Sequence, residues 1–225
     1  MLSTLDGVVR DSVRSRIRER RSISDSLKTA FDFVFSLFAL IFLSPAIAVI
    51  CILLLIQDGW PLIYRHKRIG RYGREFDCLK FRTMRRDADR ALQHFLASNE
   101  AARREWETHQ KLRRDPRVHA VGRILRMTSL DEIPQFLNVL RGEMSIVGPR
   151  PVVEDELARY GDHTYCYLLL TPGITGLWQV SGRNDTSYDN RVEIDAHYYA
   201  TRSFALDLKI MWRTVGVLLL DRNGC

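Results

Sequence analysis

The sequence predicts an α+β fold that is mostly helical, with a small β-hairpin. We expect it to be monotopic, attached to a membrane by an N-terminal re-entrant helix-break-helix hairpin and interfacial amphipathic helices. Two observations predict this class: a long uncharged apolar run near the N-terminus, and helical spacing of apolar residues in the rest, interrupted by one alternating stretch. The 225 residues therefore divide into a basic arm (1–27), a membrane hairpin (28–57) and a cytoplasmic domain on the membrane surface (58–225).

Charge and cysteine content narrow the functional classes. The chain has 34 Lys and Arg residues against 27 Asp and Glu, a formal net charge of +7. This balance fits a chain that meets nucleic acid, anionic lipid or phosphorylated substrates. The four cysteines form no CxxC pair, so we expect neither a zinc site nor a disulfide framework, and a reducing compartment for most of the chain.

The apolar run covers residues 33–56, where 24 consecutive positions carry no charge and 21 are apolar. As a helix it would be about 36 Å long at ~1.5 Å per residue, enough to cross a hydrocarbon core of about 30 Å. It is about twice as long as the apolar core of a signal peptide. A freely soluble protein is therefore not expected, and a single transmembrane anchor is the simplest interpretation.

Two features favour a re-entrant hairpin over this anchor. Ser44-Pro45 divides the run, and because proline removes a backbone donor and clashes with the preceding turn, we expect the helix to break there. Basic residues flank the run at 10–28 and at 57–74, and such residues favour the cytoplasmic side of a membrane. A hairpin that enters and leaves through the cytoplasmic face satisfies this preference at both ends.

Apolar spacing predicts the elements that follow the run. Residues 61–84 alternate around a Gly-containing turn at 70–73, which predicts the β-hairpin. Residues 85–112 have helical spacing. Residues 204–220 form an amphipathic segment, either a helix packed in the core or an interfacial helix lying on the membrane.

Adjacent carboxylates at Asp131 and Glu132 begin another helical segment. Pro134 has no N–H, and it is tolerated at the third helical position if Asp131 is the N-cap. Both carboxylates would then be ionised at the positive end of a helix. A cap followed by a first-turn acid is the structural explanation for such a pair.

The same pair also suits chemistry on phosphate. Two adjacent carboxylates repel each other, and Mg²⁺ would relieve this repulsion while leaving coordination positions for phosphate oxygens. An ionised aspartate can act as a nucleophile on phosphorus. Arg126 stands five residues before Asp131, and its planar fork can neutralise a phosphate oxygen.

Two loops add further arginines. Arg150 lies between two prolines that restrict its backbone, which suits a preset anion contact, although a solvated surface turn is the structural alternative. Residues 171–185 are rich in glycine and contain Arg183, with a spacing that matches neither a P-loop nor a dinucleotide fingerprint. We therefore predict a multi-phosphate pocket beside the carboxylate pair, formed by Lys80, Arg82, Arg126, Arg150 and Arg183.

These features occur together in one known family. The chain resembles the bacterial sugar transferases, small monotopic phosphoglycosyl transferases that are also called polyprenyl-phosphate hexose-1-phosphate transferases. The resemblance covers residues 26–220 and rests on motifs in fixed order, namely Ser44-Pro45, Lys80-Phe-Arg-Thr-Met84, Ser129-Leu-Asp-Glu132, Val147-Gly-Pro-Arg-Pro151, Pro172-Gly-Ile-Thr-Gly176 and Gly182-Arg-Asn184. Residues 142–157 are most similar to exopolysaccharide-initiating galactose- or glucose-1-phosphate transferases.

The resemblance implies a two-step reaction. Asp131 would attack the β-phosphate of a UDP-hexose and release UMP, and polyprenyl (undecaprenyl) phosphate would then take the phosphosugar from Asp131. Glu132 would help Asp131 hold Mg²⁺, and the five cations named above, with Gln179, would contact phosphate or substrate. The enzyme would work among membrane lipids at the cytoplasmic face of a bacterial inner membrane. The identity of the hexose and the formation of a homo-oligomer are left open.

A function of a different class competes with this one. A membrane-tethered basic protein that binds anionic lipid or nucleic acid would explain the +7 charge without using Asp131 and Glu132. No helix-turn-helix, zinc-finger or RNA-binding signature is present, so nucleic acid is not an expected partner. Two departures from the family are noted: Pro134 stands where some members have leucine, and we expect the four-helix membrane domain of longer relatives to be absent.

The hairpin makes a direct prediction of topology. Single cysteines placed near Ser22 and near Gly73, in a background without the native cysteines, should both react with an impermeant thiol reagent from the cytoplasmic side only. Labelling would be compared between intact cells and inverted membrane vesicles. Labelling of the two positions on opposite faces would show that the run spans the bilayer.

Overall fold

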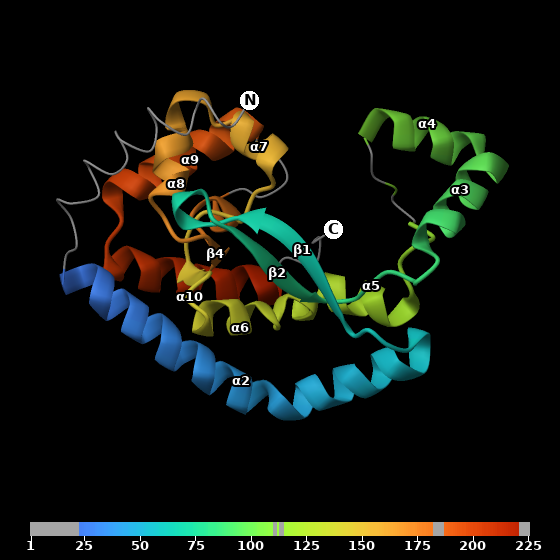
Figure 1. Ribbon diagram of the computed structural model, residues 1–225, viewed down its shortest axis with the longest axis horizontal. Helices are drawn as coiled ribbons and strands as arrows, with labels where there is room; N and C mark the ends of the chain where they lie inside the picture. The colour runs from blue at the N-terminus through green and yellow to red at the C-terminus, as the bar shows by residue number, and fades with distance from the viewer. Residues whose placement is uncertain (1–22, 110–111, 113–114, 182–186, 221–225) are drawn as a thin grey trace. The chain divides into compact units, whose positions relative to one another are not determined.

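A computed structural model describes residues 23–109, 112, 115–181 and 187–220 (Figure 1). Most of the basic arm and the predicted contact Arg183 lie outside these residues. The helices and strands, in chain order, are α2 (Ile23–Asp58), β1 (Ile63–Ile69), β2 (Glu75–Phe81), α3 (Ala88–Ser98), α4 (Glu100–His109), α5 (Ala120–Met127), α6 (Gln135–Leu140), β3 (Ser145–Val147), α7 (Glu154–Ala158), α8 (Thr164–Leu168), β4 (Gly173–Thr175), α9 (Tyr188–Thr201) and α10 (Phe204–Leu220). The predicted α+β class with a majority of helix is confirmed.

The chain forms two compact units, and each is described by itself. The first unit contains Met1–Phe42, Arg65–Leu79 and Gln135–Asp221. The second contains Leu43–Tyr64, Lys80–Pro134 and Arg222–Cys225. Two small sheets are present among the described residues: β1 pairs with β2, and β3 pairs in parallel with β4.

Helix α2 contains the apolar run and exposes most of it. Phe42 is 72% exposed and Ile56 79%, and an 18-residue window within Asp25–Asp58 has a mean hydropathy of 3.0. Within the described residues it is the one helix that is long and apolar enough to cross a membrane. Such exposure suits contact with lipid, because a helix of a soluble core buries its apolar side chains.

The expected interruption of the helix at Ser44-Pro45 is not observed, because α2 remains helical through both residues, with Pro45 inside it. A proline removes a single hydrogen bond from the ladder. In an apolar segment, leaving more backbone groups unpaired would cost more than continuing the helix. The re-entrant course of the two arms stays a prediction.

The predicted β-hairpin over 61–84 is confirmed by β1 and β2. The backbone N–H of Gly70 donates to the carbonyl of Arg74 at 2.7 Å, which closes the turn. Tyr72 and Gly73 have positive φ angles of 61° and 73°. Phe76 and Cys78 are buried on one face of β2, and Leu79 and Phe81 are buried on the other, so both faces of this strand contribute to packing.

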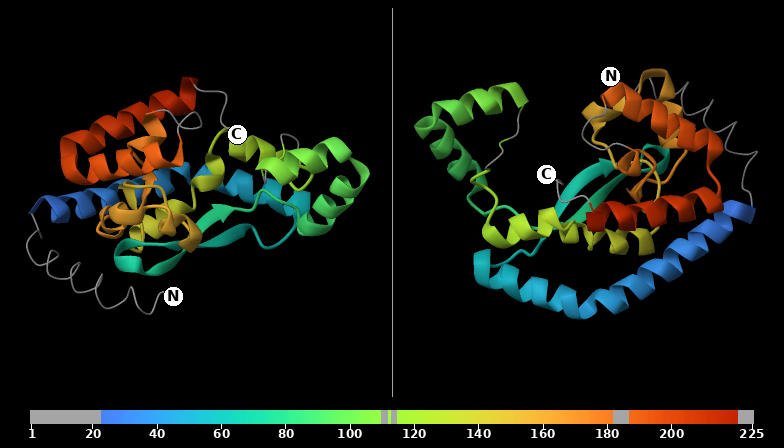
Figure 2. Two further views of the ribbon diagram at one scale, coloured as in Figure 1. Left: turned by 90° about the horizontal axis from the view of Figure 1, so that it is seen from above. Right: turned by 180° about the vertical axis from the view of Figure 1, so that it is seen from behind.

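The predicted helical stretch over 85–112 consists of two helices, α3 and α4, drawn in green in Figure 2. The side-chain oxygen of Asn99 accepts a hydrogen bond from the backbone N–H of Ala102 at 3.0 Å. Asparagine in this position is a strong N-cap, and it starts a second helix where apolar spacing alone suggested one continuous segment.

Residues 204–220 form the helix α10, and its packing in the core is confirmed. Ile210 of α10 is 1% exposed and packs in a core with Val147, Met144 and Tyr198. On another face of α10, Trp212 is 79% exposed. The helix, red in Figure 2, therefore packs on the core and presents apolar side chains outward as well, as an interfacial helix would. Its contact with a membrane stays a prediction.

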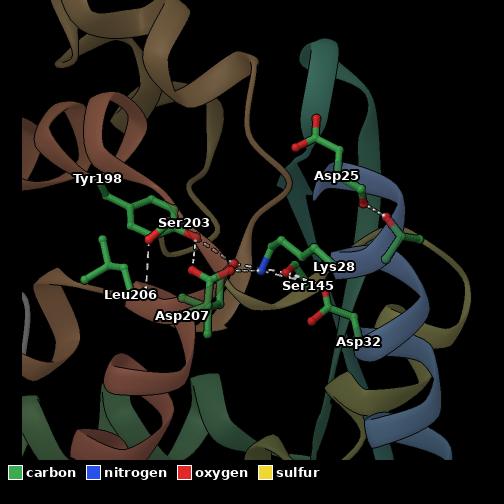
Figure 3. A network of polar contacts seen from close by, with 10 residues as sticks. Asp25, Lys28, Asp32, Ser145, Tyr198, Ser203, Leu206 and Asp207 are labelled. Atoms are coloured by element: carbon green, nitrogen blue, oxygen red, sulfur yellow. Dashed lines mark hydrogen bonds and ion pairs between the residues drawn. The ribbon is translucent and has the colours of Figure 1, made fainter. Parts of the chain in front are cut away.

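A buried polar network links the start of α2 to the rest of the first unit, as Figure 3 shows. Lys28 Nζ lies 2.7 Å from Asp207 Oδ2, and the Tyr198 hydroxyl donates to Asp207 Oδ1 at 2.6 Å. Ser145 Oγ donates to Asp32 Oδ2 at 2.6 Å. The network borders a cavity of about 520 Å³ and connects α2 with β3, α9 and α10.

We predict that Asp207→Asn lowers the unfolding temperature of the detergent-solubilised protein. Asparagine keeps an acceptor for Tyr198, but Lys28 loses its close counter-charge, and the loss is about 2 kcal/mol for a half-buried pair. The control is Asp25→Asn, because Asp25 lies 3.9 Å from Arg202 in a more exposed pair. Parent-like unfolding of the Asp207 variant would show that the ion pair does not hold α2 in place.

Candidate functional site

The predicted catalytic carboxylates, Asp131 and Glu132, lie in a short 3₁₀ turn, Leu130–Glu132. Asp131 is therefore not the N-cap of a helix, which corrects the sequence-based prediction. The preceding Ser129 is left-handed, with φ of 55°, and redirects the chain, so the next turn closes through tight i to i+3 bonds. Pro134 lacks an N–H and cannot continue the ladder, so α6 begins only at Gln135.

Helix α5 precedes this turn and is fixed by His119, a residue that sequence reasoning missed. His119 Nδ1 accepts from the backbone N–H of Gly122 at 2.8 Å, and Nε2 lies 3.2 Å from the carbonyl oxygen of Arg82. Burial lowers the pKa of His119, so a neutral ring with the proton on Nε2 fits both contacts. A histidine directly before a helical run was the available signal.

Gly122 brings α5 into backbone contact with the segment after β2. A Cβ atom at this position would lie 2.1 Å from the carbonyl oxygen of Thr83, so no side chain fits. One turn later, Arg126 Nε donates to Thr83 Oγ1 at 2.8 Å. The same segment therefore fixes both the helix and the arginine that was predicted to contact phosphate.

The carboxylate pair lies among cations in the second unit. Lys80 Nζ is 2.6 Å from Glu132 Oε1. Asp131 is 9% exposed, and its burial raises the pKa of its carboxyl; Lys80 and Arg126 oppose this shift, while Glu132 adds to it. A buried carboxyl with a raised pKa, beside two cations and a second carboxylate, is typical of a functional site.

Arg82 makes structural contacts at the end of α2. Its Nη2 lies 2.9 Å from Asp58 Oδ2 and donates to the carbonyl oxygens of Asp58 and Gly59 at 3.1 and 2.8 Å. A cation at a helix C-terminus satisfies carbonyls that lack partners within the helix. These contacts account for Arg82 without a phosphate, and its role in substrate binding stays a prediction.

In the first unit, the segment Pro149-Arg150-Pro151 is fixed through its carbonyl groups. The backbone N–H of Gly173 donates to Pro149 at 2.8 Å, and Arg68 Nη1 donates to Pro151 at 3.3 Å. Arg150 itself is half-buried. The rigid backbone agrees with the prediction of a preset arginine, because little backbone freedom remains to be lost on binding.

A buried tyrosine fixes the residue that follows this segment. The hydroxyl of Tyr167 accepts from the backbone N–H of Val152 at 3.1 Å and donates to the carbonyl of Ile69 at 2.6 Å. The backbone N–H of Ile69 also donates to the carbonyl of Val152 at 2.9 Å. The end of β1 thus holds the loop from one side.

Three motif glycines have a packing role that the sequence did not indicate. A Cβ atom added to Gly148 would lie 2.3 Å from the carbonyl oxygen of Thr171. One added to Gly173 would lie 2.1 Å from the backbone nitrogen of Gly148, and one added to Gly176 would lie 2.2 Å from the carbonyl oxygen of Gly148. These glycines let the backbones after β3 and around β4 touch each other. Gln179, in the following turn, donates from Nε2 to the Ile174 carbonyl at 3.0 Å.

The structure therefore groups only part of the predicted site. Asp131, Glu132, Lys80 and Arg126 are grouped in the second unit, whereas Arg150 and Gln179 belong to the first. The pocket that gathers all five cations stays a prediction. Among the described residues, no group of three or more His, Cys, Asp or Glu side chains could hold a metal ion. The carboxylate pair fits Mg²⁺ only if substrate oxygens supply further ligands, as is usual for this ion at phosphates.

Comparison with known proteins gives concordant matches. The bacterial sugar transferase family matches residues 23–221. The exopolysaccharide production protein ExoY of Sinorhizobium fredii is 52% identical over 204 residues, 91% of this chain and 90% of that protein. The undecaprenyl-phosphate galactose phosphotransferase of Salmonella typhimurium is 49% identical over 88% of this chain but 41% of its own length. The UDP-glucose:undecaprenyl-phosphate glucose-1-phosphate transferase of Escherichia coli is 36% identical over 84% of this chain and 39% of its own.

Proposed function

Because the chain belongs to the bacterial sugar transferase family, we propose that it transfers a hexose-1-phosphate from a UDP-hexose to undecaprenyl phosphate and so initiates exopolysaccharide synthesis. The relatives described above, an exopolysaccharide production protein and two undecaprenyl-phosphate sugar-phosphate transferases, support this donor class, this lipid acceptor and this process. The observation that carries the proposal is the buried Asp131 beside Glu132, Lys80 and Arg126.

In the proposed reaction, a carboxylate oxygen of Asp131 attacks the β-phosphorus of the donor. The bond between this phosphorus and the bridging oxygen breaks, and UMP leaves with the bonding electrons. The phosphosugar is then held as an acyl phosphate on Asp131. A phosphate oxygen of undecaprenyl phosphate attacks the same phosphorus, a diphosphate forms, and the Asp131 carboxylate is released.

The side chains near Asp131 suit the negative charge that moves between the phosphate groups during this reaction. Arg126 and Lys80 can neutralise phosphate oxygens as charge moves to the leaving UMP. Asp131 and Glu132 would hold Mg²⁺, which would supply further neutralisation of the diphosphate when bound. By family resemblance, Arg150 and Arg183 are assigned to the nucleotide and diphosphate, and Gln179 to phosphate or substrate binding.

The exposed apolar surface of α2 supports contact with a membrane, and family resemblance assigns the enzyme to the bacterial inner membrane with its catalytic residues on the cytoplasmic side. At the membrane surface a lipid-linked phosphate can meet a water-soluble nucleotide sugar, so the membrane location would bring the two substrates together. A protein that merely binds anionic lipid would not need the buried Asp131.

We predict that Asp131→Asn abolishes UMP release from UDP-galactose and UDP-glucose in the presence of undecaprenyl phosphate and Mg²⁺. Loss of the nucleophile should lower the rate by about a thousandfold or more. Asparagine should not lower the unfolding temperature, since a buried carboxyl with a raised pKa disfavours the folded state at neutral pH. If Asp131→Asn releases UMP at the parental rate, the covalent mechanism is wrong. If the parent protein releases no UMP, the proposed transferase activity is wrong.

The raised pKa of Asp131 also predicts the pH dependence of the reaction. Because the nucleophile must be ionised, the rate should fall on acidification at a higher pH than expected for an ordinary aspartate. Lys80 lowers this pKa, so Lys80→Met should move the acid limb of kcat/KM for the UDP-hexose to still higher pH. The control is Lys67→Met, whose side chain is 80% exposed and should leave the limb in place. A limb unmoved in both variants would show that Lys80 does not act on Asp131.

A further inference from the structure

Arg191 is an arginine that no motif of the sequence singles out, yet it is 6% exposed. It lies in the first turn of α9, the helix that follows the loops containing Arg150 and Gln179. Lysine and arginine side chains are rarely buried to this extent unless a partner compensates the charge. The contacts of Arg191 should therefore reveal why the fold accepts it.

The guanidinium of Arg191 lies between two motif loops of the first unit. Its Nη2 donates to the carbonyl of Arg150 at 3.4 Å. Its central carbon lies 4.9 Å from the ring centre of Trp178 and 5.1 Å from that of Tyr188. One planar side chain thus contacts the backbone of the Pro-Arg-Pro segment and the aromatic ring next to Gln179.

The positive charge has a compensating carboxylate. Asp195 lies one turn further along α9 and is 3% exposed. The Tyr160 hydroxyl donates to Asp195 Oδ2 at 2.7 Å. Burial raises the pKa of Asp195, and the hydrogen bond from Tyr160 and the charge of Arg191 both oppose this shift. Asp195 therefore offsets the charge of Arg191 within α9. The edge of the guanidinium contacts the Arg150 carbonyl, and its face contacts the Trp178 ring.

We propose that Arg191 is a positioning residue, which sets the backbone of Arg150 against the Trp178 turn and thereby tunes affinity for the nucleoside diphosphate part of the donor. The inference rests on the proposed function, and it adds a residue to which the family resemblance assigned no role. A planar guanidinium suits this task, since it can donate along its edge and stack on its face at the same time.

The variant Arg191→Lys distinguishes the positioning role of Arg191 from a role of its positive charge alone. Lysine keeps a cation near Asp195 but loses the planar fork, so the unfolding temperature should stay near that of the parent. The KM for UDP-hexose and the Kd for UDP, measured by calorimetry in detergent micelles, should both rise about tenfold, the size expected for a lost charged hydrogen bond. The kcat should change by less than about threefold, because the chemical step lies elsewhere.

Two further variants keep the test decisive. Trp178→Leu removes the ring against which Arg191 packs but keeps both Arg191 and Asp195. Like Arg191→Lys, it should raise the Kd for UDP. Arg159→Gln is the matched control, because Arg159 also lies over the Tyr188 ring, at 3.7 Å, but is exposed. It should keep the parental KM and Kd.

A double-mutant cycle with Arg150→Ala tests the route of the effect. If Arg191 acts through Arg150, the effect of Arg191→Lys on the Kd should largely disappear once Arg150 is alanine. Additive effects, or a parental Kd in both Arg191→Lys and Trp178→Leu, would overturn the inference alone. A parent protein that neither binds UDP nor releases UMP would overturn the proposed function, and this inference with it.

Discussion

Burial of carboxylates is the constraint around which the described structure is organised. Removing an ionised carboxylate from water costs several kcal/mol unless a cation or hydrogen-bond donors replace the lost hydration. Asp131, Asp195 and Asp207 are each at most 9% exposed. Each has a basic residue among its interactions, namely Lys80 for Asp131, Arg191 for Asp195 and Lys28 for Asp207. These interactions fix the turn that contains Asp131, helix α9 and the start of α2.

The three sites differ in how fully the charge is satisfied. Asp207 accepts a hydrogen bond from Tyr198 and pairs directly with Lys28, so both oxygens are engaged. Asp131 has a weaker arrangement, because the amine of Lys80 lies against Glu132. A carboxylate that is buried but incompletely paired is destabilising for the fold and is available for chemistry, which is the usual compromise at an active site.

Sequence reasoning succeeded where the period of apolar residues had one structural solution. The alternation over 61–84 predicted the hairpin that β1 and β2 form. It failed where one residue adopted a conformation that its type rarely takes, as with the left-handed Ser129, which removed Asp131 from the cap position. It also missed Arg191, because an arginine in the first turn of a polar helix looks like a solvated residue until the packed rings around it are known. The continuous helix through Pro45 could not be foreseen from local preference alone.

The contact between the loops after β3 and around β4 has a consequence for diversification of the enzyme. At Gly148, Gly173 and Gly176 even a methyl group would overlap backbone atoms, so these positions tolerate no substitution without displacing both loops together. A library of variants in these loops should therefore leave the three glycines untouched and vary the side chains beside them. Steric contact fixes these three backbone positions, which leaves variation to the residues that the loops present.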